Sequence, residues 1–185
     1  ARYCEENSIP FAGLNFVSTS KRYVDEETAT SISTTLQNSV SVGIFQNQEV
    51  AEVNRIAIKV DLDFVQLSGS ESVEYCQQVV KPVIKTLKIT ELALIKEYEK
   101  VVQMFIIDGA IPGSGKGYDY SLLKHIDSKR PFLVAGGVNR ENAGAILSEL
   151  TGAAGLDVAS GIETDGLVDI LKIESIAQAV KESNA

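Results

Sequence analysis

Short apolar runs alternate with polar stretches along the whole chain of 185 residues. In the polar stretches, apolar residues recur three or four positions apart, as Val53, Ile56 and Ala57 do, which is typical of an amphipathic helix. Apolar runs that are each followed by such a helix indicate a parallel sheet covered by helices. Seven runs have this character: Phe11–Val17, Val40–Phe45, Phe64–Leu67, Val83–Leu87, Val101–Ile107, Phe132–Val134 and Leu156–Val158.

Polar residues that can cap a helix stand just before several of the helical stretches. Asp25 and Asn139 each occupy the position expected of an N-cap. Ser68 is a third candidate, with Glu71 three residues later as in a capping box. These caps place the predicted helices directly after the apolar runs.

The ends of the runs favour a barrel over a doubly wound sheet. Asp108, Gly136 and Ser160 follow different runs at their C-terminal ends, where the sites of βα barrels assemble. A doubly wound sheet usually carries its glycine-rich turn after the first strand, and the N-terminal half of this chain has none. We therefore expect one α/β domain over residues 1–185, a parallel (βα)8 TIM barrel. Because seven strands are visible and residues 1–7 resemble the end of a helix, we also expect its first strand to be missing.

Two of the runs end in turns with almost no side-chain bulk. One turn contains Gly136 and Gly137, and the other contains Ser160 and Gly161. Backbone N–H groups in such turns can approach a ligand closely, and their partial positive charge suits a phosphate. A pair of these turns on neighbouring strands is the usual phosphate site of a βα barrel. We therefore predict phosphate binding at these four residues.

Composition and charge restrict the partners. The net charge of −8 and the pI near 4.7 argue against a nucleic acid or an anionic membrane surface as partner. No apolar run approaches the roughly 20 residues of a membrane helix. No signal peptide is visible. The two cysteines, Cys4 and Cys76, form neither a disulfide framework nor a metal cluster, so the cytoplasm is the expected compartment.

Several motifs together carry a resemblance to a known family, because they occur in that family's order. They are Ser20-Lys21-Arg22-Tyr23-Val24, Val42-Gly43-Ile44-Phe45-Gln46-Asn47-Gln48, Val65-Gln66-Leu67-Ser68-Gly69, Ile107-Asp108, Pro112-Gly113-Ser114-Gly115-Lys116-Gly117, Ala135-Gly136-Gly137-Val138-Asn139 and Asp157-Val158-Ala159-Ser160-Gly161-Ile162-Glu163-Thr164. With these motifs the chain resembles the phosphoribosylanthranilate isomerases, barrel enzymes of tryptophan biosynthesis. The resemblance runs from about Phe11 to the C-terminus.

The resemblance implies an isomerase that converts N-(5′-phosphoribosyl)anthranilate to 1-(2-carboxyphenylamino)-1-deoxyribulose 5-phosphate. The implied reaction is an acid–base Amadori rearrangement that needs no cofactor and no metal. By position, Asp108 matches the family's general acid, and Arg22 matches the arginine that faces the anthranilate carboxylate. Asp157 matches an aspartate near the reacting centre, and the two small-residue turns match the phosphate site. The expected partner is a small phosphorylated substrate, and the expected assembly is a monomer or a homodimer.

The chain departs from the family pattern at three places. The family's general base is a cysteine in a Lys-x-Cys-Gly motif on the first strand, and Cys4, which Glu5 follows, is not that residue. Ser68 stands where the family often has histidine, and Ala159 replaces the first serine of the usual Ser-Ser-Gly turn. Turnover is therefore expected on condition that the missing strand supplies the base.

Other interpretations stay open on the sequence alone. A catalytically inactive paralogue would bind the phosphorylated ligand without turning it over. An indole-3-glycerol phosphate synthase would share the phosphate site, but it needs a lysine acid at a strand end, and none is evident. Asp108 also fits a plain turn residue, and Arg22 also fits a solvated basic edge beside Lys21. The glycine-rich segment 113–117 is interpreted as a lid, with Lys116 as a candidate substrate contact.

Overall fold

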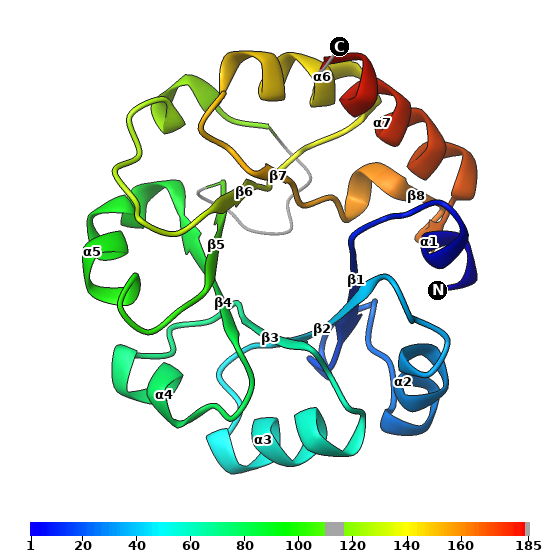
Figure 1. Cartoon of the computed structure of the whole chain (residues 1–185), viewed down its shortest axis with the longest axis vertical. Coiled ribbons are helices and arrows are strands. Elements are labelled where there is room, and N and C mark those ends of the chain that lie inside the picture. Colours follow the sequence, from blue (N-terminus) through cyan, green and yellow to red (C-terminus); the bar gives the residue numbers. More distant parts are fainter. Residues whose placement is uncertain (110–116, 184–185) are drawn as a thin grey trace. The chain divides into compact units, whose positions relative to one another are not determined.

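The computed structural model describes residues 1–109 and 117–183. The chain divides into two compact units, one formed by Ala1–Thr86 with Lys100–Gln103 and the other by Leu87–Glu99 with Met104–Ala185. In each unit, parallel strands alternate with helices along the chain (Figure 1). This alternation confirms the predicted α/β class.

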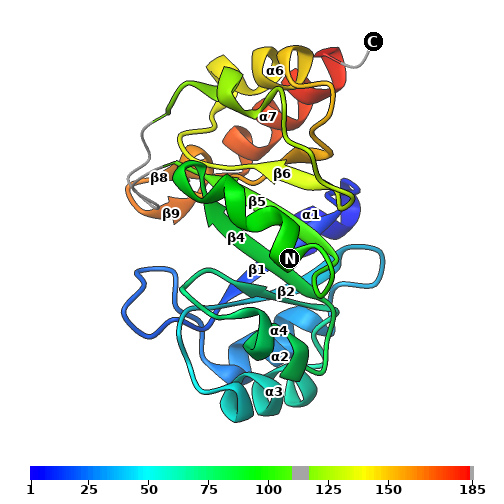
Figure 2. The same cartoon turned by 90° about the vertical axis from the view of Figure 1, so that its left-hand side faces the viewer.

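The first unit contains four parallel strands that pair in chain order, and Figure 2 shows helices α2, α3 and α4 on one face of them. Because a parallel pair needs a crossover connection, each strand leads into a helix before the next strand begins. The strands are β1 (Phe11–Asn15), β2 (Val40–Phe45), β3 (Phe64–Leu67) and β4 (Val83–Lys88), and the helices are α1 (Arg2–Glu6), α2 (Glu26–Ser33), α3 (Val50–Lys59) and α4 (Val73–Gln78).

The core of the first unit forms between its strands and helices. Val53, Ile56 and Ala57 on α3 are buried, as their spacing predicts. Gly43 on β2 allows the closest packing, because a Cβ atom there would lie 2.3 Å from Leu62 Cδ1. A larger residue at position 43 would therefore force this core apart.

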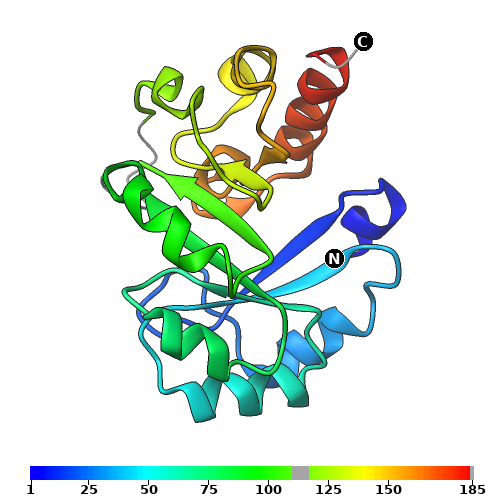
Figure 3. The same cartoon turned by 60° about the vertical axis from the view of Figure 1, so that its left-hand side comes forward.

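The second unit contains three parallel strands, β5 (Met104–Asp108), β6 (Phe132–Val134) and β7 (Gly155–Leu156), again paired in chain order. Helices α6 and α7 pack against each other (Figure 3), and a Cβ atom on Gly144 of α6 would lie 3.2 Å from the carbonyl oxygen of Ala179 on α7. The helical elements are η1 (Ile89–Leu94), α5 (Ile95–Tyr98), η2 (Tyr120–Leu123), α6 (Arg140–Glu149), η3 (Ser160–Ile162) and α7 (Ile170–Ser183).

Each of the seven predicted runs overlaps one of the seven parallel strands found in the described residues, although the bounds differ in four of them, and the structure adds one hairpin. The fifth strand begins at Met104 rather than at Val101, although Val102 is fully buried. The last strand covers only Gly155–Leu156. An antiparallel hairpin of β8 (Glu163–Thr164) and β9 (Leu167–Val168) was not predicted. The single barrel domain over residues 1–185 stays a prediction.

Two of the three predicted helix caps are confirmed. The Asp25 side chain accepts a hydrogen bond from the N–H of Thr28, and Asn139 forms a capping box at the start of α6. The predicted cap at Ser68 is wrong, because α4 begins after Ser72, whose side chain accepts from the N–H of Tyr75. The residue that made Ser68 look like a cap, Glu71, uses its carboxylate elsewhere.

Candidate functional site

The turn after β6 has a backbone that only glycine adopts easily. Gly136 has φ +86° and Gly137 has φ +71°, both in the left-handed region. A Cβ atom on Gly136 would lie 2.6 Å from Asp108 Oδ1 and 2.9 Å from the backbone nitrogen of Gly109. Glycine at position 136 therefore allows the carboxylate at the end of β5 to lie directly against this turn.

Two side chains hold consecutive peptide planes of this turn by their carbonyl groups. The Tyr120 hydroxyl donates to the carbonyl oxygen of Gly136 at 2.6 Å. The Asn142 amide Nδ2 donates to the carbonyl oxygen of Gly137 at 3.0 Å. In a trans peptide the C=O and the following N–H point in opposite directions, so the N–H groups of Gly137 and Val138 are turned away from these side chains. Neither N–H donates to another residue that the structure describes, so both can bind an anion.

The turn after β7 packs against the first turn. Ser160 and Gly161 form η3, and a Cβ atom on Gly161 would lie 2.0 Å from the carbonyl oxygen of Val138. Only glycine fits at position 161, and its absence of a side chain brings the two turns into contact. Asp157 lies just before this turn, where its backbone N–H donates to the carbonyl oxygen of Val134 at 2.8 Å.

A pocket of about 480 Å³ lies at these turns. Three of the four residues predicted to bind phosphate, Gly137, Ser160 and Gly161, line this pocket, whereas Gly136 is not among its lining residues. The pocket wall also contains two cations that the sequence did not point to, Arg140 at the start of α6 and Lys172 on α7, and one carboxylate, Glu141. The remaining lining residues are Val138, Asn139 and Ser175. In a chain of net charge −8, this lining provides local donors and positive charge for an anion.

Asp108 is the last residue of β5 and is half-buried. Its Oδ1 atom accepts a hydrogen bond from the N–H of Gly109 at 2.7 Å. Two tyrosines that the sequence did not single out, Tyr118 and Tyr120, lie beside it with their ring centroids 4.6 Å apart. Burial raises the pKa of both phenols above the ordinary tyrosine value, and the charge of neighbouring groups such as Asp108 raises it further. Both therefore stay protonated donors, and Tyr118 donates to the carbonyl oxygen of Ile107 at 3.3 Å.

Arg22 belongs to the first unit, whereas the other predicted site residues belong to the second. It lies in the segment that follows β1 and is half-buried. Its backbone N–H donates to Ser20 Oγ at 3.1 Å, and the next residue, Tyr23, forms a bridge to Asn15 at the end of β1. The arginine therefore stands at the C-terminal end of its strand, where the sites of βα proteins form.

Neither cysteine lies at the end of a strand. Cys4 is in α1, and Cys76 is in α4, 2% exposed, where burial raises the pKa of its thiol to about 11. His125 is exposed, as expected. Within residues 1–109 and 117–183, no three His, Cys, Asp or Glu side chains gather to hold a metal ion, and no helix has the length and apolar character to cross a membrane. Lys116 and most of the predicted lid, residues 113–116, lie outside the described residues.

Parallel βα units with a pair of glycine-containing turns at neighbouring strand ends are typical of phosphate-binding βα proteins. A family model described as N-(5′-phosphoribosyl)anthranilate (PRA) isomerase matches residues 2–179. The chain belongs to this isomerase family, which confirms the resemblance read from its motifs. Because the match begins at residue 2, it gives no support to the expectation that the first strand is missing.

Known relatives agree with this family. The N-(5′-phosphoribosyl)anthranilate isomerase of Dehalococcoides mccartyi is 39% identical over 192 residues, which cover 94% of this chain and 87% of that protein. The crystal structure of the enzyme from Thermus thermophilus matches with a TM-score of 0.83 at 30% identity, covering 93% of this chain and 88% of that chain. A phosphoribosyl anthranilate isomerase in complex with reduced 1-(o-carboxyphenylamino)-1-deoxyribulose 5-phosphate matches with a TM-score of 0.80 at 26% identity, covering 96% and 94%.

Proposed function

We propose that this chain converts N-(5′-phosphoribosyl)anthranilate to 1-(2-carboxyphenylamino)-1-deoxyribulose 5-phosphate in tryptophan biosynthesis. Membership of the family over residues 2–179 carries the proposal, and the pocket at the two glycine turns supports it. A closed (βα)8 barrel and a cytoplasmic location belong to the same proposal. The relative that binds a reduced form of the product shows that the family accommodates a phosphorylated sugar bearing a carboxyphenylamino group.

The substrate phosphate binds at the turns after β6 and β7. The N–H groups of Gly137 and Val138 point away from the side chains that hold their peptide planes, so no rotation of the backbone is needed when the anion arrives. Ser160 and Gly161 complete the site from the neighbouring turn. Donors that are oriented before binding lose little entropy on binding, which favours affinity for one end of the substrate.

Asp108 is the general acid of the proposed reaction. Its carboxyl group gives a proton to the furanose ring oxygen as the C1′–O bond breaks, which leaves a Schiff base between the sugar and the anthranilate nitrogen. A base then removes the proton on C2′, which gives an enolamine. The enolamine becomes the ketone when C1′ takes up a proton and the hydroxyl on C2′ gives one up. An acid role requires the carboxyl group to lie where the ring oxygen can reach it, and Asp108 is the last residue of β5, half-buried at the end of the strand.

Arg22 and Asp157 are the remaining proposed substrate residues. A guanidinium presents a planar pair of N–H donors that fits a carboxylate, so Arg22 suits the anthranilate carboxylate. Asp157, three residues before η3, is assigned a role near the reacting centre because its position matches that residue of the family motif. Neither cysteine of the chain has the position of the family's base, so the C2′ base is assigned to neither.

One observation keeps a second function open. The pocket at the two glycine turns supports phosphate binding, whereas no cysteine stands at a strand end in residues 1–109 and 117–183. A binding protein without turnover would show this combination. Family membership, in contrast, removes the indole-3-glycerol phosphate synthase alternative.

The variant Asp108→Asn separates the two functions. Turnover is measured with N-(5′-phosphoribosyl)anthranilate made in the assay, and affinity is measured by titrating the reduced product analogue. If the chain is the isomerase, the wild-type chain turns the substrate over, and the variant has a kcat about 100- to 10,000-fold lower, the range for loss of a general acid. The variant should still bind the analogue. Binding of the analogue without wild-type turnover would favour the binding protein instead.

A further inference from the structure

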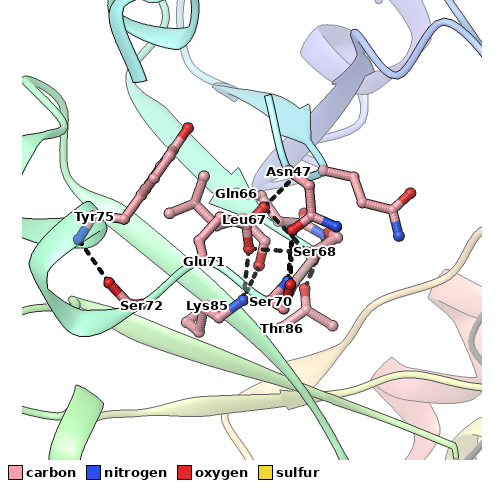
Figure 4. Close-up of polar contacts among 12 residues, drawn as sticks. Asn47, Gln66, Leu67, Ser68, Ser70, Glu71, Ser72, Tyr75, Lys85 and Thr86 are labelled. Atoms are coloured by element: carbon pink, nitrogen blue, oxygen red, sulfur yellow. Dashed lines mark hydrogen bonds and ion pairs between the residues drawn. The ribbon is translucent and has the colours of Figure 1, made fainter. Parts of the chain in front are cut away.

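Three polar side chains meet at the C-terminal ends of β3 and β4 in the first unit (Figure 4). The Gln66 amide Nε2 donates to Ser68 Oγ at 3.1 Å and to Thr86 Oγ1 at 3.2 Å. The two hydroxyl groups also contact each other, with 3.3 Å between their oxygens. We call these three residues the hydroxyl cluster. Gln66 and Ser68 are two positions apart, so they share one face of the strand.

The hydroxyl cluster has hydrogen-bonding capacity that its own contacts do not use. Each hydroxyl accepts from Gln66, and one of the two O–H groups donates to the other. One O–H donor therefore remains, and no other described residue accepts from it. The Gln66 carbonyl oxygen likewise accepts no hydrogen bond within the described part of the chain. One donor and one acceptor side by side match a single hydroxyl group, which both donates and accepts.

A buried ion pair fixes the backbone on both sides of Ser68. The Lys85 Nζ atom donates to the carbonyl oxygens of Leu67 at 3.2 Å and Gly69 at 2.6 Å, and to Glu71 Oε2 at 2.8 Å. The side chains of Lys85 and Glu71 are 2% and 1% exposed. Because Lys85 holds the carbonyl groups that flank Ser68, this hydroxyl has a defined position before any ligand binds.

Glu71 ties the same segment to the loop after β2. Its carboxylate accepts hydrogen bonds from the N–H of Asn47 at 2.8 Å and from the N–H of Gly69 at 2.9 Å. Asn47 Oδ1 in turn accepts from the N–H of Ser70 at 2.8 Å. The ion pair neutralises its own charge, so the neighbouring hydroxyl cluster presents neutral groups to a ligand. A phosphate or a carboxylate prefers charged donors, which leaves a neutral hydroxyl as the fitting guest.

We propose that Gln66, Ser68 and Thr86 bind one hydroxyl group of the sugar part of the substrate, and that Lys85 and Glu71 are positioning residues for Ser68. The inference rests on the proposed function, which supplies a sugar with several hydroxyl groups and places substrate at the C-terminal ends of strands. It also gives a physical meaning to serine at position 68, since a small side chain leaves room for the ligand to reach Thr86 on the next strand.

Deoxy counterparts of the reduced product analogue test the subsite. Each counterpart lacks one sugar hydroxyl, and its Kd is compared with that of the parent analogue by titration calorimetry. On the wild-type chain, one counterpart is expected to bind about 5- to 150-fold more weakly than the parent, the range for leaving buried polar groups without a partner. In the Ser68→Ala/Thr86→Val double variant, which keeps only Gln66 of the cluster, the difference in Kd between the parent and that counterpart is expected to shrink.

A matched control comes from Ser70→Ala, which removes an exposed hydroxyl bonded to Asn47 outside the cluster and should keep the wild-type discrimination. Lys85→Met/Glu71→Met is expected to remain folded, because no charge is left buried alone, and to reduce the discrimination although all three cluster residues are present. Unchanged discrimination in Ser68→Ala/Thr86→Val would overturn the subsite, and unchanged discrimination in the Lys85 and Glu71 variant would overturn the positioning role. Failure of the proposed function looks different, since the wild-type chain would then bind none of the analogues.

Discussion

Replacing Gly136 by alanine tests whether the turn after β6 is built around the carboxylate of Asp108. The added Cβ atom would lie 2.6 Å from Asp108 Oδ1, 2.9 Å from the Gly109 nitrogen and 3.2 Å from Tyr118 Cε1. The backbone at φ +86° adds a cost of about 1–2 kcal/mol for any L side chain. Overpacking at this contact adds about 1–3 kcal/mol, so the free energy of unfolding is expected to fall by about 2–5 kcal/mol.

Two other glycines separate these contributions. Gly166 has φ +80° and open space around its Cβ position, so Gly166→Ala carries only the backbone cost of about 1–2 kcal/mol. Gly152 has open space and no left-handed backbone, so Gly152→Ala is expected to be neutral or to stabilise by a few tenths of a kcal/mol, about the gain from reduced unfolded-state entropy.

Urea denaturation of the three variants measures these free energies, and turnover of N-(5′-phosphoribosyl)anthranilate measures the consequence for the acid. Gly136→Ala should lower kcat because Asp108 Oδ1 must move, whereas Gly166→Ala should keep it. The reasoning is refuted if Gly136→Ala costs no more stability than Gly166→Ala, because the contact with Asp108 would then carry no energy.

Three further changes probe other parts of the molecule. Tyr120→Phe removes the hydroxyl that holds the Gly136 carbonyl and should weaken binding of the reduced product analogue about 3- to 10-fold with little change in kcat; an equal loss for an analogue without phosphate would contradict this. Lys85→Met leaves the Glu71 carboxylate buried without its cation and should cost about 3–5 kcal/mol of stability in urea denaturation, and a loss below about 1 kcal/mol would count against the buried pair. Hydrogen bonds from Arg55 lower the pKa of Glu26 to about 2 from an ordinary value of 4.5, so its stabilisation is present above pH 4.5 and is lost as the pH falls toward 2. In Glu26→Gln, the free energy of unfolding should fall less steeply with pH in that window. The same fall as in the wild-type chain would show that Glu26 does not contribute this stabilisation.

Local sequence patterns were enough to predict the elements that depend only on residues close to them in the sequence. The cap at Asn139 depends on residues within three positions, and the alternation of apolar runs with helical spacing places the strands. Glycines likewise marked the two turns at the pocket, because a left-handed backbone at Gly136 and Gly137 and the close contact at Gly161 leave few other residues that fit.

Features that depend on distant residues could not be predicted in this way. Ser68 and Glu71 have the spacing of a capping box, but the Glu71 carboxylate bonds to Lys85, fourteen positions away, and the helix begins later. Lys172 lines the pocket at the two turns from a helix that follows the second turn, and no local pattern marks it. The tyrosines beside Asp108 were missed for the same reason, since they come from a segment after the strand and meet the carboxylate only in the folded chain.

The buried pair of Lys85 and Glu71 shows how the sequence can suggest the wrong role for a residue of functional interest. A lysine within an apolar strand has no evident use on the sequence alone. In the folded chain it holds two carbonyl groups and one carboxylate, and so determines where Ser68 stands. Buried polar groups of this kind act by fixing a single local conformation, since their net contribution to stability is small compared with a hydrophobic replacement.

A crystal structure of this chain with the reduced product analogue tests the central claim most directly. The account predicts the phosphate within hydrogen-bonding distance of the N–H groups of Gly137 and Val138 and of the turn at Ser160 and Gly161, with the Asp108 carboxyl group facing the sugar. A phosphate bound away from both turns, with Asp108 out of contact with the ligand, would contradict it.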